Sequence, residues 1–197
     1  ALSDFANVRR GGIIAIKIVP GDNLIEARFT SGHDDVVLVT SNGQSIRFHE
    51  DDVRTMGRSA AGVRGIRLVK EDHVIALAIA DPEAMLLVAG ENGKAKKSDF
   101  DDYRVQARGG KGIITMKITK KTGKVIGGLT VHNGDEIMLI TVGGQMVRTS
   151  VDGIRLTGRN TQGVRLVNVH DKDRLQDIAP VVSVEQTVES DAEETSS

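Results

Sequence analysis

The sequence predicts an all-β fold, a propeller-like array of four-stranded blades with about 50 residues per repeat. The first observation is a recurring segment in which a glycine precedes a β-branched, basic stretch that we predict to be a strand: Gly12–Ile18, Gly62–Leu68, Gly112–Ile118 and Gly163–Val169. Their glycines are 50, 50 and 51 residues apart. Self-similarity at such a period indicates a repeat architecture, because one unit cannot bury its apolar face alone.

The second observation is a turn signal with the same period. Asn42-Gly43, Asn92-Gly93 and Gly143-Gly144 each lie between two strand-like runs. An Asn-Gly pair favours a tight type I′ hairpin, since both central residues need positive φ. No segment has a sustained helical period, and four short strands per unit are typical of a propeller blade.

The expected strands follow from short β-branched runs bounded by Gly, Asn or Asp. In chain order they are Ile13–Ile18, Leu24–Phe29, Asp35–Thr40, Ser45–Phe48, Val74–Ile79, Ala84–Ala89, Val125–Leu129, Glu136–Thr141, Val164–Val169 and Ile178–Val184. The last unit is incomplete, and Leu2–Phe5 resembles the end of a preceding unit. We therefore expect the C-terminal part of a larger repeat domain, whose open sheet edges favour self-association.

Composition narrows the class of protein further. Only 3% of the 197 residues are aromatic and none is Trp, so the core must consist of Val, Ile and Leu. The chain has no Cys, which excludes disulfides and thiolate metal sites and fits a reducing, cytoplasmic compartment. No apolar run is long enough to cross a membrane, and no signal peptide is recognisable.

The charge is distributed unevenly along the chain. Residues 1–180 carry all 26 Lys and Arg but 22 of the 27 Asp and Glu, a net charge of +4. We expect residues 1–180 to form one β domain and residues 181–197 to be an acidic, disordered tail. A basic body indicates an anionic partner for which the tail competes; the alternative is a tail that only aids solubility.

Basic residues recur in register with the repeat. One set lies four residues after the hairpin glycine: Arg47, Lys97 and Arg148. A second set is Arg54, Arg104 and Arg155, and a third set, four residues before the loop glycine, is Arg58, Arg108 and Arg159. Equivalent positions in successive blades project to one face, so these residues predict arcs of charge suited to phosphates. The alternative is local pairing with acidic pairs such as Asp51-Asp52 or Asp101-Asp102.

The loop Gln106–Gly112 is the most distinctive local motif. Gly109, Gly110 and Gly112 would let backbone N–H groups approach a phosphate, while Arg108 and Lys111 supply charge. It lacks the P-loop spacing. A shorter relative is Arg9-Arg10-Gly11-Gly12, and a plain turn is the alternative interpretation for both.

No active site is recognisable in the sequence. Tyr103 occupies a repeat position that holds Val53 and Ile154 elsewhere, which indicates a core residue. The five histidines share no metal-ligand spacing, and the recurring Asp pairs favour turns and caps. We expect no catalytic residue, metal or cofactor in this segment.

Two segments and the glycine loop resemble a known family. Val53–Leu68, Thr157–Val164 and the loop Gln106–Gly112 are similar to the C-terminal domain of the DNA gyrase A protein, and the resemblance spans residues 1–180. The loop resembles the gyrase-A box, with Ala107 in its second position. The acidic tail is also similar to the tail of many gyrase A proteins.

The resemblance implies a β-pinwheel that binds and wraps duplex DNA around a basic perimeter without catalysis. The parent protein would be an ATP-dependent type II topoisomerase, in which the rest of gyrase A connects this domain to the ATPase, gyrase B. The implied location is the bacterial cytoplasm, at the nucleoid. Alternatives are the related domain of the topoisomerase IV A protein and a propeller-like scaffold for protein partners.

Overall fold

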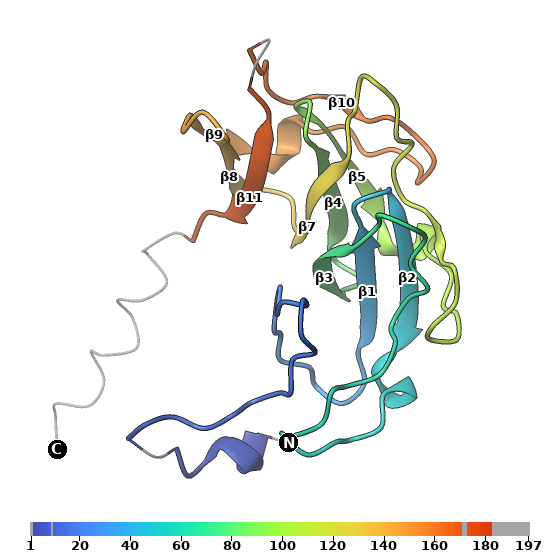
Figure 1. The fold of residues 1–197 in the computed structure, drawn as a ribbon. Helices are drawn as coiled ribbons and strands as arrows, with labels where there is room; N and C mark the ends of the chain where they lie inside the picture. Colours follow the sequence, from blue (N-terminus) through green and yellow to red (C-terminus); the bar gives the residue numbers. More distant parts are fainter. Residues whose placement is uncertain (1, 9, 171–172, 183–197) are drawn as a thin grey trace, which may run out of the picture.

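The computed structural model describes residues 2–8, 10–170 and 173–182, which form three antiparallel sheets along an open arc (Figure 1). The strands are β1 (Asp35–Thr40), β2 (Gln44–His49), β3 (Val74–Ala80), β4 (Met85–Gly90), β5 (Lys94–Asp99), β6 (Ile113–Ile114), β7 (Val125–Val131), β8 (Glu136–Thr141), β9 (Met146–Ser150), β10 (Val164–Arg165) and β11 (Leu175–Pro180). Short 3-10 turns are η1 (Leu2–Phe5), η2 (Glu50–Asp52), η3 (Phe100–Asp102) and η4 (Val151–Gly153).

Each blade combines strands from different repeats. Blade A has the strand order β3-β1-β2-β6, blade B has β7-β4-β5-β10, and blade C has β11-β8-β9. In blade A, the central hairpin β1-β2 comes from one repeat, the inner strand β3 from the next, and the outer strand β6 from the one after that. Blade B has the same order, with β4-β5 as the hairpin, β7 as the inner strand and β10 as the outer strand. A sequence repeat is therefore not a blade, and the outer and inner strands connect neighbouring blades covalently.

Several strand predictions are confirmed and others are wrong. The central hairpins lie where expected, but Ile13–Ile18, Leu24–Phe29 and Gly62–Leu68 are irregular. The segments equivalent to them in later repeats do form strands: β6 pairs with β2, and β3 pairs with β1. The described residues contain no hairpin with which the three irregular segments could pair in the same way. Ile14 is therefore 73% exposed and Phe29 81% exposed.

The last unit also differs from the prediction. The expected strand Val164–Val169 is limited to β10, because only Val164 and Arg165 align with Ala95 and Lys94 of β5. The strand expected at Ile178–Val184 begins earlier, as β11, and its final two positions lie outside the described residues. Most of the predicted acidic tail, residues 183–197, also lies outside them, so that prediction stays untested.

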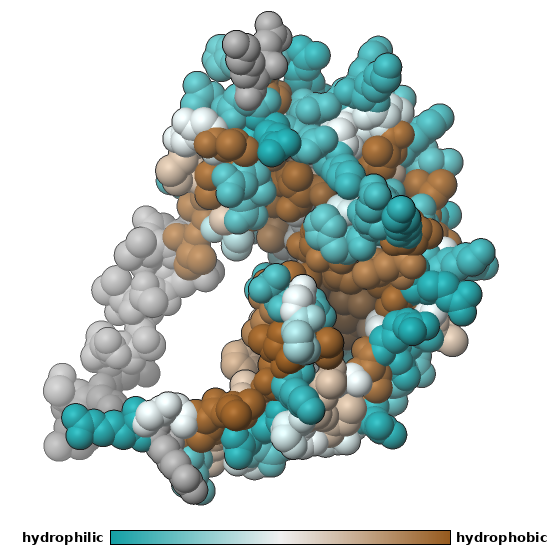
Figure 2. Space-filling model, in the orientation of Figure 1, coloured by the Kyte–Doolittle hydropathy of each residue, from teal (hydrophilic) through white to brown (hydrophobic). Residues whose placement is uncertain are grey.

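The core lies between the blades and is mostly aliphatic, as composition predicts, but Phe100 and Tyr103 also belong to it. Val37, Leu86 and Met116 pack between blades A and B, and Leu87 and Ile137 between blades B and C. Tyr103 joins the first cluster at 1% exposure, so its prediction as a core residue is confirmed. Figure 2 shows hydrophilic side chains along much of the convex side of the arc and apolar ones gathered on its concave side.

Candidate nucleic-acid interface

The third basic set makes the same hydrogen bond between successive repeats at each of its three positions. Arg58 Nη1 donates to the carbonyl oxygen of Ile14 at 3.0 Å, and Arg159 Nη1 donates to that of Ile114 at 3.0 Å. Arg108 Nη1 donates to the carbonyl oxygen of Arg64, the equivalent position, at 2.5 Å. Each guanidinium thus connects its loop to the glycine-led segment one repeat earlier. A guanidinium carries five N–H donors, so each of these half-buried side chains keeps further N–H groups available for another acceptor.

The first basic set is largely committed to the protein. Arg47 forms an ion pair with Asp35 at 2.8 Å and donates from Nη1 to the carbonyl oxygen of Phe100 at 2.8 Å. Lys97 is only 4% exposed, which leaves it little surface for a phosphate. Arg148 remains exposed while it pairs with Glu136, and this hydrogen bond lowers the pKa of the Glu136 carboxyl and raises the pKa of Arg148.

The second basic set is the one that the fold presents to solvent. Arg54, Arg104 and Arg155 are exposed, and within the described ranges their side chains have no hydrogen bond or ion pair, including with the nearby Asp pairs. Val105 forms an isolated β-bridge with Arg47 of β2, and Leu156 forms one with Lys97 of β5. Arg104 and Arg155 therefore directly precede residues at the outer edges of blades A and B. Arg104 and Arg155 thus recur at the outer edges of successive blades, and Arg54 is the exposed residue at the equivalent position of the first repeat.

The box-like loop uses two of its backbone donors inside the protein. Gln106 N donates to Arg47 O at 2.8 Å, and Gly109 N donates to Gly65 O at 2.6 Å. The Gly109 N–H is therefore engaged within the protein, and the phosphate contact expected of the loop glycines stays a prediction. Gly112 has φ 74°, and an ideal Cβ there would lie 2.3 Å from Ser45 O, so close packing requires glycine.

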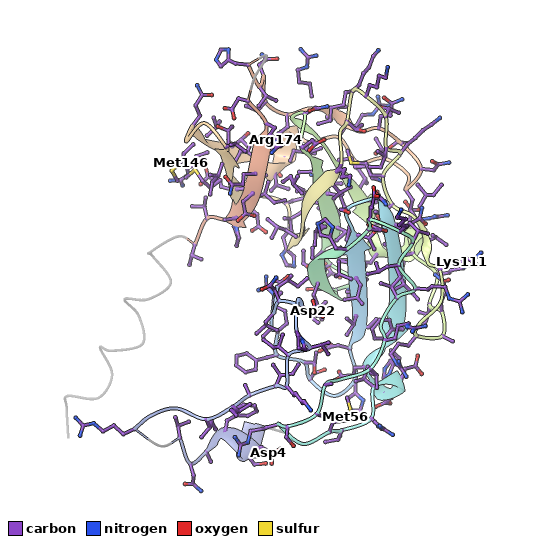
Figure 3. The ribbon with its side chains drawn as sticks, viewed as in Figure 1. Asp4, Asp22, Met56, Lys111, Met146 and Arg174 are labelled. Atoms are coloured by element: carbon purple, nitrogen blue, oxygen red, sulfur yellow. The ribbon has the colours of Figure 1, made fainter. Side chains whose placement is uncertain are left out.

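The charge of this loop comes from its side chains. Lys111 is exposed and points outward from the convex side of the arc (Figure 3). Arg108 is half-buried, and its Nε also donates to Asp52 O at 3.2 Å. Arg10 is exposed near the N-terminus, while Arg9 lies outside the described residues. The DNA-binding roles predicted for these residues stay predictions.

Sequence reasoning missed a buried lysine beneath the corresponding loop of blade B. Lys96 is 0% exposed, and its Nζ donates to Gly158 O at 2.9 Å, Arg159 O at 2.8 Å and Ser98 Oγ at 2.8 Å. Burial is the main cause that lowers the pKa of Lys96 to about 8. The available signal was a lysine at a repeat position that holds Ile46 and Val147 in the other units.

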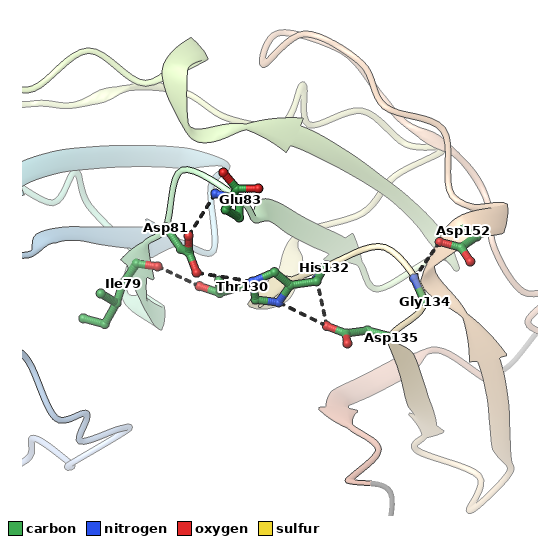
Figure 4. Close-up of polar contacts among 8 residues, drawn as sticks. All are labelled: Ile79, Asp81, Glu83, Thr130, His132, Gly134, Asp135 and Asp152. Carbon is green, nitrogen blue, oxygen red and sulfur yellow. Dashed lines mark hydrogen bonds and ion pairs between the residues drawn. The ribbon is translucent and has the colours of Figure 1, made fainter.

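Polar contacts also connect the loops that follow the inner strands (Figure 4). Thr130 Oγ1 donates to Ile79 O at 3.0 Å, and His132 Nε2 lies 3.2 Å from Asp81 Oδ2. The backbone N–H of Glu83 and the His132 contact lower the pKa of Asp81. Gly134 N donates to Asp152 Oδ1 at 2.9 Å. The Thr130 and His132 contacts join blades A and B, and the Gly134 contact links the β7–β8 loop to η4.

The sequence matches the family described as "DNA gyrase C-terminal domain, beta-propeller" in four consecutive stretches, residues 1–31, 34–81, 84–132 and 135–181. The stretches follow the repeat and cover most of the chain. The chain belongs to this family. The predicted resemblance and the all-β, propeller-like fold class are thereby confirmed for this gyrase C-terminal domain. None of its described helices is long and apolar enough to cross a membrane.

Individual relatives agree with the gyrase family. The DNA gyrase A protein of Halalkalibacterium halodurans is 59% identical over 180 residues, which cover 91% of this chain and 22% of that protein. A solved DNA gyrase A C-terminal domain has a TM-score of 0.79 at 25% identity, covering 88% of this chain and 59% of the other. The C-terminal domain of DNA topoisomerase IV shares the fold, with a TM-score of 0.85 at 22% identity over 91% of this chain and 57% of the other. The chain spans about a fifth of the length of the curated relative.

Proposed function

We propose that this chain binds duplex DNA along the convex edge of its arc, and bends and wraps it without base-sequence specificity, as the C-terminal domain of a gyrase A protein. The observation that carries the proposal is the recurrence of Arg54, Arg104 and Arg155 as exposed cations at one repeat position, with Arg104 and Arg155 at the outer edges of blades A and B. Lys111 adds charge at the same side. Phosphate contacts of this kind position a duplex and carry no sequence information.

The energetics follow from the polyanionic duplex. Bending a site of tens of base pairs costs about 1–6 kcal/mol, which contacts along a curved, basic surface offset. Each phosphate that a cation neutralises releases counterions, so binding weakens with salt by a slope of about −0.9 per contact. The described fold contains no helix longer than a 3-10 turn that could enter a major groove, which supports recognition of the backbone.

We further propose that this segment is non-catalytic and holds no cofactor. Its one tyrosine, Tyr103, is 1% exposed with its hydroxyl 2.7 Å from Thr115 Oγ1, so it has no access to a phosphodiester. Strand cleavage and ATP hydrolysis would belong to the rest of gyrase A and to the ATPase, gyrase B, in the bacterial cytoplasm at the nucleoid. The 59% identity to a gyrase A protein favours gyrase over topoisomerase IV, for which only the fold argues.

The test is topology-resolved DNA binding. Relaxed plasmid is incubated with the protein, nicks are sealed with ligase, and the linking number is read at low and moderate salt. We expect a linking-number shift that fades with salt. Binding without a shift would favour the topoisomerase IV type of domain, and binding that is insensitive to salt, or absent, would overturn the proposal.

A matched pair of variants assigns the surface. Arg54→Ala/Arg104→Ala/Arg155→Ala should reduce the salt slope by about 0.9 for each lost contact and diminish the linking-number shift. The control Arg28→Ala/Lys124→Ala/Arg174→Ala removes the same charge from residues that line pockets among the inner strands. Equal losses from both variants would show that net charge alone matters, which would contradict a defined outer contact surface.

A further inference from the structure

A fourth set of basic residues recurs with the repeat, distinct from the three sets described above. It consists of Lys17, Arg67 and Lys117, which are 50 residues apart. All three are exposed, and within residues 2–8, 10–170 and 173–182 none of their side chains forms a hydrogen bond or an ion pair. The next repeat has Asn168 at this position, so the set has three cations.

The fold holds each member of the fourth set beside an outer loop. The same hydrogen bond recurs, from a backbone N–H to a loop carbonyl oxygen: Lys17 N to Ala60 O at 3.2 Å, Arg67 N to Gly110 O at 2.8 Å and Lys117 N to Thr161 O at 2.8 Å. In the second and third repeats the preceding residue is buried, Ile66 at 5% and Met116 at 1% exposure. Successive side chains of an extended chain point to opposite faces, so the next residue is turned outward.

The second and fourth sets lie at different ends of the outer edge of blade A. Arg104 precedes the residue that bridges Arg47 of β2. Lys117 follows the residue whose N–H donates to Gly43 O in the hairpin turn, at 3.3 Å. Four residues from Gly43 to Arg47 correspond to about 13 Å along a strand. The major groove is about 12 Å wide, so cations of both sets can reach phosphates of a single duplex.

The charges beyond the two sets differ in sign. Next to the second set, η2 and η3 carry the exposed pairs Asp51-Asp52 and Asp101-Asp102, which repel a polyanion. At the hairpin-turn end, Lys120 and Lys121 are exposed, and Lys120 O accepts a hydrogen bond from Asn92 Nδ2 at 3.0 Å. A duplex is therefore repelled at one end of the blades and attracted toward the other.

We propose that Lys17, Arg67 and Lys117 form a separate row of phosphate contacts, so that the duplex lies between this row and the second basic set. The inference rests on the DNA binding proposed above and assigns the path of the duplex across the outer surface. The outer loop that contains residues 106–112 lies between the rows, since it follows Arg104 and its Gly110 O binds Arg67 N. The duplex is thus displaced toward the hairpin turns and away from the acidic turns.

The salt dependence of binding counts these contacts. Lys17→Ala/Arg67→Ala/Lys117→Ala removes three charges and keeps the backbone hydrogen bonds. Each lost contact should reduce the salt slope by about 0.9, so a rise from about 50 to 200 mM salt should weaken wild-type binding about 40-fold more than binding by the variant. Lys17→Arg/Arg67→Lys/Lys117→Arg keeps the charge and should retain the wild-type slope. The control Arg28→Ala/Lys124→Ala/Arg174→Ala removes charge from the pockets among the inner strands and should change the slope far less.

The outcomes separate this inference from the function on which it rests. If Arg54→Ala/Arg104→Ala/Arg155→Ala lowers the slope and the fourth-set variant does not, the row is overturned and the proposed function stands. Equal losses in the fourth-set variant and its control would also overturn the row, because net charge alone would account for them. A wild-type protein without salt-dependent binding would overturn both proposals.

Tethered cleavage locates the duplex directly, because the chain has no cysteine of its own. Lys117→Cys and Lys124→Cys, both in the segment before β7, are labelled with an iron chelate that generates hydroxyl radicals, and nicking of a bound plasmid is measured. Lys124 lines a pocket among the inner strands, so we expect several-fold more nicking from position 117. Equal nicking from the two positions, or more from position 124, would contradict a duplex that lies along the fourth set.

Discussion

The box-like loop, residues 106–112, and its counterpart in blade B, residues 157–163, share one backbone frame but rest on different side chains. Gln106 N donates to Arg47 O, and Thr157 N donates in the same way to Lys97 O at 2.9 Å. Arg67 N donates to Gly110 O, as Lys117 N does to Thr161 O. The repeat thus fixes the path of both loops through main-chain contacts.

The side chain beneath each loop differs. Ile46 lies below the first loop, with Cδ1 3.6 Å from an ideal Cβ on Gly110. Lys96 occupies the equivalent position below the second loop and binds its carbonyl oxygens directly. An apolar contact and a buried ammonium therefore hold the same backbone, and only the ammonium responds to pH. Similar loops in this fold thus differ in what stabilises them.

The largest expected effect tests the shared frame. Gly112→Ala and Gly163→Ala should each cost about 3 kcal/mol or more in the free energy of unfolding, because each Cβ would collide with a carbonyl oxygen and φ is positive. Gly12→Ala, with a similar φ and open space, should cost only about 1 kcal/mol. Urea denaturation measures all three. Markedly unequal costs at Gly112 and Gly163 would contradict a common frame.

The next effect tests the difference between the loops. Because the pKa of Lys96 falls from 10.5 to about 8 on folding, the unfolded chain binds more protons between these values. The free energy of unfolding should therefore rise with pH across the window from about 8 to 10.5, by up to about 3 kcal/mol, and this residue should add no pH dependence below the window. Lys96→Met should abolish the rise, as measured by denaturation at stepped pH.

Amide hydrogen exchange provides an independent measurement on the same Lys96→Met variant. Losing three hydrogen bonds from the Lys96 ammonium should raise exchange rates in residues 157–162 and leave residues 106–111 unchanged. Ile46→Val, which trims the apolar floor of the first loop, serves as the control. Uniform acceleration in both loops would mean that Lys96 supports the whole domain and not one loop.

The smallest effect concerns the hydrogen bonds that the loop arginines make between successive repeats. Arg108→Ala and Arg159→Ala should each reduce the free energy of unfolding by about 0.5–1.5 kcal/mol, the usual contribution of such a bond. Arg→Lys at either position keeps the charge but loses the planar fork, so it should not restore full stability in urea denaturation. Complete rescue by lysine would indicate that charge matters there and geometry does not.

Much of this fold and part of the interface could be predicted from the sequence. The repeat period, the central hairpins and their glycine turns depend on local chemistry, so the residues near Asn42 and Asn92 predict them directly. The core position of Tyr103 follows from comparing repeats. The outward-facing second set of arginines was one of three periodic sets, and periodicity treats all three alike.

Tertiary structure decided which repeat supplies each strand of a blade and which cations face solvent. β3 and β6 join blade A from later repeats, and strand propensity does not encode a pairing partner so distant in sequence. Because strands from later repeats join each blade, some repeat positions are covered while their equivalents are exposed. The burial of Lys96 and Lys97 and the ion pair of Arg47 arise in this way. The sequence therefore determined the units and their spacing. Only the packing of one blade against the next assigned each charge to the interior or to the surface.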